Sequence, residues 1–275
     1  FLGGNIGFTT NEELVVKNTK NIGTITVSDK ITKAFYFYAG GLVGYASKAI
    51  TFDNCHNAMK AGVENGVVIK GTWASGGGSN TVRFGGIVGY PSSGVLTFKN
   101  GVTNSANMHL AAKYRDSGGF SVGGIAGVCS GSAHTFTGLV QNSGNLYYEG
   151  ECPSGTFCIG GCMGQFGASA AKSIEKLVNT GNITAVKTVA NSFPTGTKNG
   201  IIAGIAASCS GNLPNAQSVC TITAIDVEAV RGAEKIIHVA SNMGAPEELE
   251  EAKRLNKMYR EGHIEELRKI YPGMM

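Results

Sequence analysis

The sequence predicts an all-β protein, a parallel β-helix (β-solenoid) of about 11 to 12 coils with a short α-helical segment at its C-terminal end. Three observations predict this fold. Glycine occupies 41 of the 275 positions, a Gly-Gly-x-x-Gly motif recurs along the chain, and an asparagine motif recurs between its copies. Recurrence at a regular period indicates a solenoid, in which each unit packs against its two neighbours.

The glycine motif marks the start of each repeat. Its complete copies start at Gly3, Gly40, Gly85, Gly123 and Gly160, 37 to 45 residues apart, and a degraded sixth copy covers 203–207. Glycine permits a positive φ or a close approach of neighbouring coils at a bend. The predicted structural anchors are therefore the glycines of the central copies: Gly40, Gly41, Gly44, Gly85, Gly86, Gly89, Gly123, Gly124 and Gly127.

An Asn-x-x-Asn motif follows each glycine pair after 14 to 19 residues, at 18–21, 54–57, 104–107, 142–145 and 179–182. Asparagine tolerates the left-handed conformation and can stack its amide along the axis of a solenoid. Asn142, Asn145, Asn179 and Asn182 are expected to act as anchors in this way. Each repeat then splits into two half-units of roughly 19 residues, and we expect each half-unit to form one coil.

The sequence divides into three regions. Residues 1–230 form the predicted β-helix domain, 231–245 a last strand or linker, and 246–275 a helical cap or docking segment. From Pro246 the apolar residues adopt helical spacing, and residues 245–275 carry 13 of the 42 charged side chains. A cap over the last coil, a docking or oligomerisation element and an unrelated tail all remain open for this segment.

Two strings, Gly-Gly-Leu-Val-Gly-Tyr at 40–45 and Gly-Gly-Ile-Val-Gly-Tyr at 85–90, resemble the GLUG-motif repeats of bacterial secreted and surface proteins. The similarity extends over residues 1 to about 225. Such repeats occur in adhesin-like proteins of gut Bacteroidetes and in non-catalytic regions of some secreted metallopeptidases. The resemblance implies a secreted or cell-surface location. Because Phe1 lies just before a repeat anchor, we expect the chain to derive from a longer precursor.

Charge and hydropathy argue against nucleic-acid binding and against a membrane-spanning segment. The net charge is +4, and Lys and Arg form no block or stripe, so nucleic-acid binding is not expected. No run of 18 apolar residues predicts a membrane span.

The seven cysteines do not show the paired Cys-x-x-Cys spacing of a zinc site, and neither a metal nor a cofactor is expected. Cys129 and Cys209 hold equivalent repeat positions, so they are expected to be buried. Cys152 and Cys158 flank a Pro-Ser-Gly-Thr turn and can close a small disulfide in an oxidising compartment.

Catalytic residues are not evident in the sequence. The central acids fall in different phases of the repeat, and the five histidines are dispersed, so we expect surface or turn histidines rather than a catalytic row. These observations favour a non-catalytic protein without deciding whether it is an enzyme.

Insertions into the repeat are better candidates for binding, because a solenoid accepts extra residues at its bends. Three insertions, at 70–81, 114–119 and 186–198, contain the candidate ligand-binding residues Trp73, Arg115, Asp116 and Phe193. Trp73 can stack on a sugar ring or pack against the next coil. Tyr45 and Tyr90 hold equivalent positions and predict an aromatic ladder, which is more often structural than ligand-binding.

The sequence therefore favours a non-catalytic, adhesin-like binding or structural module of a secreted or cell-surface protein. Its edge loops would bind a glycan or a host or bacterial surface protein. The alternatives are a β-helix carbohydrate-active enzyme, either a polysaccharide lyase or a hydrolase, and a passive spacer.

Overall fold

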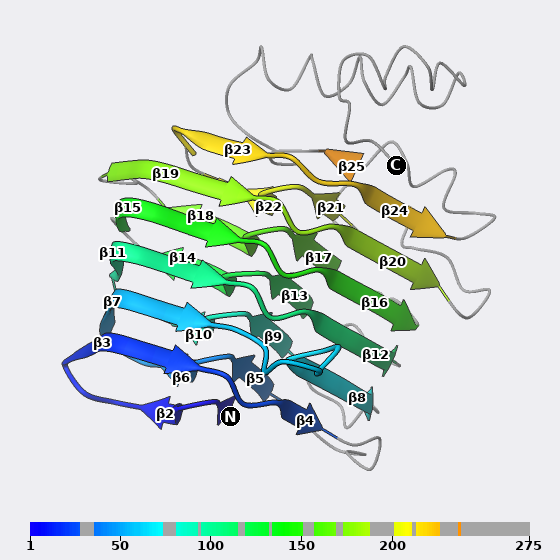
Figure 1. Cartoon of the computed structure of the whole chain (residues 1–275), viewed down its shortest axis with the longest axis horizontal. Helices are drawn as coiled ribbons and strands as arrows, with labels where there is room; N and C mark the ends of the chain where they lie inside the picture. Colours follow the sequence, from blue (N-terminus) through cyan, green and yellow to red (C-terminus); the bar gives the residue numbers. More distant parts are fainter. Residues whose placement is uncertain are drawn as a thin grey trace.

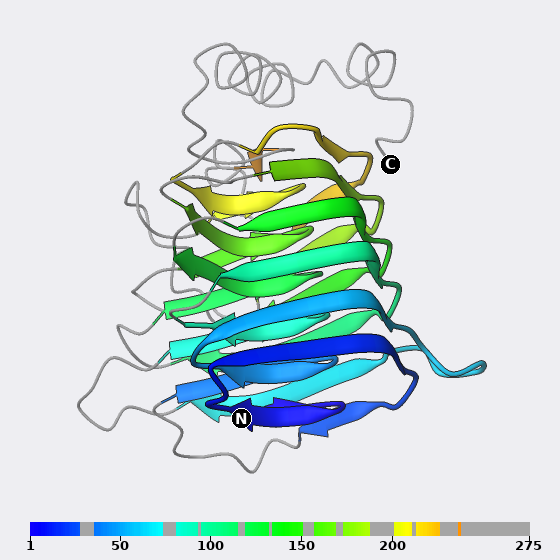
Figure 2. The same cartoon turned by 90° about the vertical axis from the view of Figure 1, so that its left-hand side faces the viewer.

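The computed structural model describes residues 1–27, 36–73, 81–92, 95–114, 119–131, 134–150, 157–168, 173–187, 201–210, 213–225 and 236–237. These residues form a parallel β-solenoid, which confirms the predicted fold class (Figure 1). The strands lie in layers that stack from β1–β4 at one end to β21–β24 at the other (Figure 2). The predicted helical segment 246–275 lies outside the described residues, as does the linker 231–245 apart from 236–237.

Four parallel sheets, named A to D here, form the walls of the solenoid. Sheet A contains β1 (Leu2–Gly3), β5 (Tyr36–Gly40), β9 (Thr81–Gly85), β13 (Gly119–Gly123), β17 (Phe157–Gly160), β21 (Ile201–Ala203) and β25 (Ile236–Ile237). Sheet B contains β2 (Ile6–Thr9), β6 (Val43–Ala46), β10 (Val88–Pro91), β14 (Ala126–Gly131), β18 (Met163–Ala168) and β22 (Ala206–Cys209).

The other two sheets continue the same coils. Sheet C contains β3 (Glu13–Asn21), β7 (Ala49–Asn57), β11 (Leu96–Asn104), β15 (Thr135–Asn142), β19 (Ser173–Asn179) and β23 (Ala216–Ser218). Sheet D contains β4 (Ile25–Val27), β8 (Val67–Trp73), β12 (Met108–Tyr114), β16 (Leu146–Gly150), β20 (Ile183–Lys187) and β24 (Ile222–Ile225). Each coil therefore contributes one strand to each sheet.

The predicted number of coils is wrong. Gly40 pairs with Gly85 and Gly85 with Gly123, so one coil takes a whole repeat rather than half of one. Sheets B, C and D contain six strands each, which corresponds to six coils and not 11 to 12. The glycine and asparagine motifs are two different bends of the same coil, and four strands fill the distance between successive glycine motifs.

The degraded sixth copy is confirmed as a repeat. Ala203 pairs with Gly160 in sheet A, and Ile222 to Ile225 pair one to one with Ile183 to Val186 in sheet D. Cys129 and Cys209 both pair with Phe166, and both are buried as predicted.

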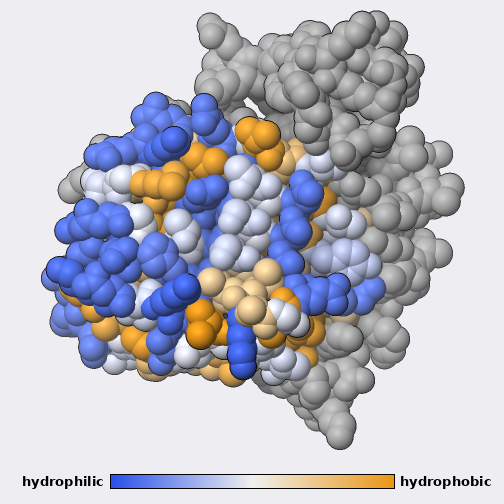
Figure 3. Space-filling model, viewed as in Figure 1, coloured by the Kyte–Doolittle hydropathy of each residue, from blue (hydrophilic) through white to orange (hydrophobic). Residues whose placement is uncertain are grey.

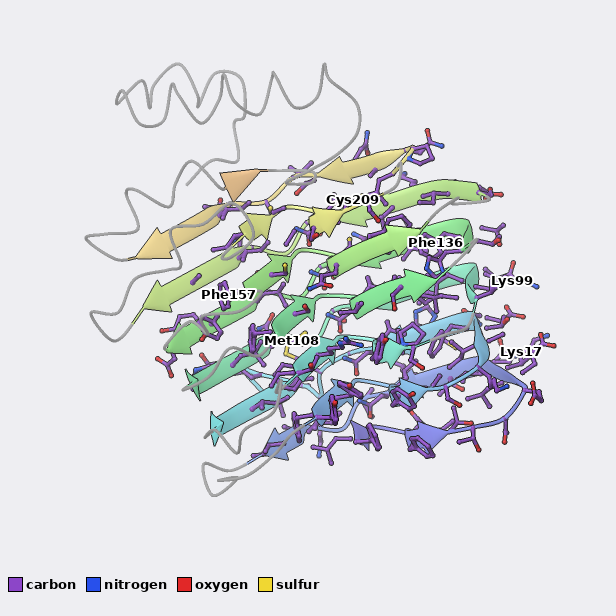
Figure 4. All side chains as sticks on the ribbon, turned by 180° about the vertical axis from the view of Figure 1, so that it is seen from behind. Lys17, Lys99, Met108, Phe136, Phe157 and Cys209 are labelled. Carbon is purple, nitrogen blue, oxygen red and sulfur yellow. The ribbon has the colours of Figure 1, made fainter. Side chains whose placement is uncertain are left out.

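The interior contains two main hydrophobic layers, each with a row of neighbouring aromatic rings. Between sheets B and C, ring centroids are 5.7 and 4.9 Å apart along the series Phe52, Phe98 and Phe136. Between sheets A and D, they are 5.9 and 5.4 Å apart along the series Phe84, Phe120 and Phe157. Figure 4 shows Phe136 and Phe157 on the two sides of the solenoid. Parallel strands bring like residues of successive coils into contact, so each layer forms one continuous core.

The motif glycines allow close approach of the backbone. A Cβ on Gly124 would lie 2.2 Å from Cγ of Asn142 and 2.3 Å from the carbonyl oxygen of Gly161 in the next coil. Among the described residues, the glycines with positive φ are Gly62, Gly101, Gly131 and Gly138, all outside the motif. Of the two roles predicted for the motif, close approach is therefore the one observed.

The predicted asparagine ladder is present, but its alignment in the first two copies was wrong. Buried amides run along the axis, and Nδ2 of each donates to Oδ1 of the next at 2.8 Å, in the order Asn21, Asn57, Asn104, Asn142 and Asn179. The second asparagine of the first two motifs thus aligns with the first asparagine of the later ones. Asn18 and Asn54 instead occupy an exposed corner, with φ of 50° and 54°.

The second asparagine of the later motifs forms a separate, exposed column. Oδ1 of Asn145 accepts the backbone N–H of Asn182 at 2.9 Å, and Oδ1 of Asn182 accepts that of Thr221 at 2.9 Å. These side chains connect successive coils through side-chain-to-backbone bonds at the surface, whereas the buried ladder bonds amide to amide. Both pairs of predicted asparagine anchors therefore have structural roles.

Candidate functional site

The outward side chains of sheets A and B converge over the bend formed by the Gly-Gly-x-x-Gly motif. We call this surface the A–B face. Tyr38 points outward from β5 and Tyr45 from β6, and their stacked rings have centroids 5.5 Å apart across the bend. Two strands of the same coil therefore supply neighbouring side chains to one surface.

Aromatic rings cover the A–B face in the first three coils. Phe8 pairs with Tyr45 and Tyr45 with Tyr90, and the ring centroids are 5.3 and 5.7 Å apart. The aromatic ladder predicted for Tyr45 and Tyr90 is thus confirmed. Tyr36 adds a ring that is 60% exposed, with its centroid 6.2 Å from that of Tyr38.

Arg83 lies within this aromatic surface. It pairs with Tyr38 in sheet A, and its Cζ lies 3.5 Å from the ring centroid of Tyr90 and 5.4 Å from that of Tyr38. Such cation–π contacts partly replace the hydration of the guanidinium. Burial raises the pKa of Tyr38, and the nearby positive charge of Arg83 opposes this shift.

Neutral polar groups surround the aromatic rings. The Tyr45 hydroxyl lies 2.8 Å from Oγ of Ser92, and Oγ of Ser130 donates to the Tyr90 hydroxyl at 3.4 Å. Further along the axis, Nε2 of Gln165 donates to Oγ of Ser121 at 2.9 Å. The A–B face thus changes from aromatic rings to a mixture of smaller residues in the later coils, where Ser121, Val128 and Cys158 are buried.

A second cluster of functional side chains lies on the outer surface of sheet D. Nε2 of His109 lies 3.0 Å from Oε1 of Glu149, and the Tyr147 hydroxyl donates to the other carboxylate oxygen at 3.4 Å. Burial raises the pKa of Tyr147, and the adjacent Glu149 carboxylate raises it further. The His109 and Glu149 side chains are 24% and 34% exposed, so both are accessible from the surface of sheet D.

The outer surface of sheet C has a different character. Figure 3 shows mainly hydrophilic residues over β3, β7, β11, β15 and β19. Lys17 and Lys99 point away from the solenoid in Figure 4, and the exposed Lys17 forms an ion pair of 3.6 Å with the partly buried Asp53. An ion pair at the surface contributes little to stability when one of its partners is well solvated, as Lys17 is.

All four predicted ligand-binding residues lie in the insertions. Trp73 is the last residue of β8 and pairs with Tyr114 of β12. Arg115, Asp116 and Phe193 lie outside the described residues. The described residues therefore do not test whether the four candidates lie together, and their role in binding stays a prediction.

The structure gives the predicted disulfide no support. Cys158 is a buried free thiol in β17, while Cys152 lies outside the described residues. Burial raises the pKa of Cys158 to about 12, so the unreactive thiol form predominates at neutral pH.

The expectation of surface or turn histidines is wrong for His134. This residue is fully buried, and its Nδ1 accepts the backbone N–H of Leu96 at 3.1 Å. Its ring lies 5.6 Å from that of Phe166, and burial lowers its pKa to about 4. His134 is therefore a neutral core residue; His238 and His263 lie outside the described residues.

No group of three or more His, Cys, Asp or Glu side chains is placed to hold a metal ion among the described residues. In the same part of the chain, no helix has the length and apolar character needed to cross a bilayer. Comparison with protein families, curated proteins and solved structures found no match. The resemblance to GLUG-motif repeats therefore stays a prediction.

Proposed function

We propose that this chain is a non-catalytic binding module of a secreted or cell-surface protein, and that its A–B face binds glycans. One observation carries the proposal: exposed and partly exposed tyrosines, Tyr36, Tyr45 and Tyr90, share one surface over two successive coils. The C–H face of a sugar ring packs on an aromatic face, while its hydroxyls bond to polar groups at the edge.

Two further features support a binding role. Ser92 and Ser130 place hydroxyls beside the tyrosines, where they can bond to sugar hydroxyls. The solenoid is also a rigid support, because each strand of the inner coils pairs with strands of the coils on either side. A preformed surface loses little conformational entropy when it binds a ligand. The resemblance to adhesin-like repeats adds the proposed location.

The proposal is tested by measuring binding to a panel of neutral and acidic polysaccharides by affinity electrophoresis and calorimetry. Tyr36→Ala is the most useful variant, because an exposed ring contributes little to stability. We expect Tyr36→Ala and Tyr45→Ala each to weaken binding at least about tenfold, equivalent to roughly 1.4 kcal/mol. Tyr147→Ala on sheet D is the matched control and should bind like the unaltered chain.

Two results would contradict the proposal. One is the absence of measurable binding to any polysaccharide by the folded chain. The other is a loss of binding in Tyr147→Ala but not in Tyr36→Ala or Tyr45→Ala, which would move the ligand to sheet D.

The second candidate function is a polysaccharide lyase, and the His109–Glu149 pair is the observation that favours it. A lyase needs a base that removes a proton next to a carboxylate, and His109 or Tyr147 has the required chemistry. A hydrolase normally needs two carboxylic acids, whereas this cluster contains one. Measurable release of unsaturated products that disappears in His109→Ala would establish the lyase and reject a non-catalytic role.

A further inference from the structure

Arg83 is unusual because of where it lies. The 13 strands of sheets A and B contain one charged side chain, and it is Arg83 of β9. Its partners in sheet A are Tyr38 and Ser121, which are both uncharged. Among the described strands of these two sheets, Arg83 is thus the one charged residue, and it lies beside aromatic rings.

No carboxylate of the described residues neutralises this charge. The ion pairs found there are Lys17–Asp53, Lys48–Glu12 and His109–Glu149, none of which includes Arg83. Its Nη1 is buried and has no hydrogen-bond partner. A buried N–H without a partner costs about 1 to 3 kcal/mol, and such groups are rare in native proteins.

The aromatic contacts explain how the guanidinium is held but leave its hydrogen bonds incomplete. Stacking on Tyr90 at 3.5 Å fixes the plane of the guanidinium. A fixed planar guanidinium is well suited to bidentate pairing with a carboxylate or another oxyanion. An anion at Arg83 would supply the missing hydrogen-bond partner, and the tyrosines beside it would contact another part of the same ligand.

We infer that the A–B face selects saccharides that carry an oxyanion, a carboxylate or a sulfate ester, and that Arg83 binds this group. The inference rests on the proposed glycan-binding function and specifies its ligand. The sugar ring stacks on Tyr45 or Tyr36, and the anion pairs with the guanidinium beside Tyr90. Charge complementarity supports it, since no acidic side chain in the strands of sheets A and B competes for Arg83.

The test uses oligosaccharide pairs that differ only in charge. The first pair is oligogalacturonate and its fully methyl-esterified form; the second is a sulfated galactan oligosaccharide and its desulfated form. Titration calorimetry on the folded chain should show at least about tenfold tighter binding to the charged member of one pair. Affinity for that member should fall as salt increases, while affinity for the neutral member stays constant. The pair that shows the preference identifies the oxyanion.

Two variants connect the preference to Arg83. Arg83→Gln keeps hydrogen-bond donors but removes the charge, so binding to the charged and neutral members should become equal. Arg83→Lys keeps the charge but loses the planar pairing and should retain only part of the preference. Circular dichroism confirms folding, and the comparison of the two members on the unaltered chain does not depend on either variant.

The outcomes separate this inference from the proposed function. Equal binding to both members of each pair, or unchanged preference in Arg83→Gln, overturns the role of Arg83 and leaves the glycan-binding proposal intact. Tighter binding to the neutral members also overturns it. Failure of the unaltered chain to bind any of the four oligosaccharides or the wider polysaccharide panel rejects the proposed function itself.

Discussion

The inner and outer sides of the bend between sheets A and B differ in how much their residues change from one coil to the next. On the inner side, Gly124 contacts Asn142, and the equivalent glycine and asparagine recur in the neighbouring coils. On the outer side, the residues of sheet B change from Tyr45 and Tyr90 to Gln165 and Ser208. The inner side is constant because each residue needs the same partner in the next coil. The outer side is free to vary, and binding specificity can arise there.

The largest expected effect is on the inner side of the bend. Gly124→Ala places a Cβ 2.2 Å from Asn142 and 2.3 Å from the backbone of the next coil, where two fixed groups must move. We expect the free energy of unfolding to fall by more than about 4 kcal/mol, measured by urea denaturation.

Gly167→Ala is the matched control for this change. Its Cβ would meet Oγ of Ser210 at 3.5 Å, an ordinary contact, so the change should be within about 0.5 kcal/mol. Similar costs for the two variants would show that close packing at the bend does not distinguish the motif glycines.

The next largest effect should follow from breaking the buried amide ladder. Asn142→Ala removes the acceptor for Asn104 and the donor to Asn179, and it leaves the Gly144 carbonyl without its 2.9 Å bond. Because the groups are buried, we expect a loss of about 3 kcal/mol in thermal or urea unfolding. Asn145→Ala, in the exposed column, should cost less than about 1 kcal/mol because water replaces its bond. Equal costs would remove the distinction between the two columns.

His134 should make the interior sensitive to acid. Its pKa is about 4 in the folded chain, against 6.5 for a histidine exposed to water, so the unfolded state takes up a proton as pH falls below 6.5. Stability from the neutral ring is therefore present above pH 6.5 and is lost towards pH 4. Between pH 7 and pH 5 the free energy of unfolding should fall by about 2 kcal/mol.

The pH dependence can be assigned with one variant. His134→Asn keeps an acceptor for the Leu96 N–H but does not titrate in this range. Urea unfolding at several pH values should show a flatter slope for His134→Asn, and an unchanged slope would assign the effect to other groups.

The smallest effect is expected on the outer side of the bend. Tyr45→Phe removes the hydroxyl that contacts Ser92 at 2.8 Å but keeps the ring stacked on Phe8 and in contact with Tyr90. Ser92 is partly exposed and can bond to water instead, so thermal unfolding should change by less than about 1 kcal/mol. A loss as large as that of Asn142→Ala would mean that the tyrosine row is part of the structural framework.

The sequence predicted the features that arise when equivalent residues of successive repeats lie side by side. The glycine copies, the aligned strands of the sixth copy, the paired tyrosines and the burial of Cys129 and Cys209 all follow from the repeat. The sequence did not predict the length of a coil. The glycine and asparagine motifs alternate in the same way whether they are two bends of one coil or single bends of two successive coils. The predicted asparagine alignment was wrong in the first two copies. There Asn18 and Asn54 lie three residues before the ladder residues Asn21 and Asn57 and produce the same Asn-x-x-Asn spacing.

Sequence by itself thus determined that this chain is a parallel solenoid and where each repeat begins, because backbone geometry at the bends demands particular residue types. Only the tertiary structure decided which residues from different coils meet. His109 and Glu149 are 40 residues apart in the sequence but form a contact. Arg83 of β9 likewise contacts Tyr38 of β5 and Tyr90 of β10. Such contacts depend on the coil length and on the side of the sheet that each residue faces. The candidate binding surface therefore became visible only when the coils were stacked in register.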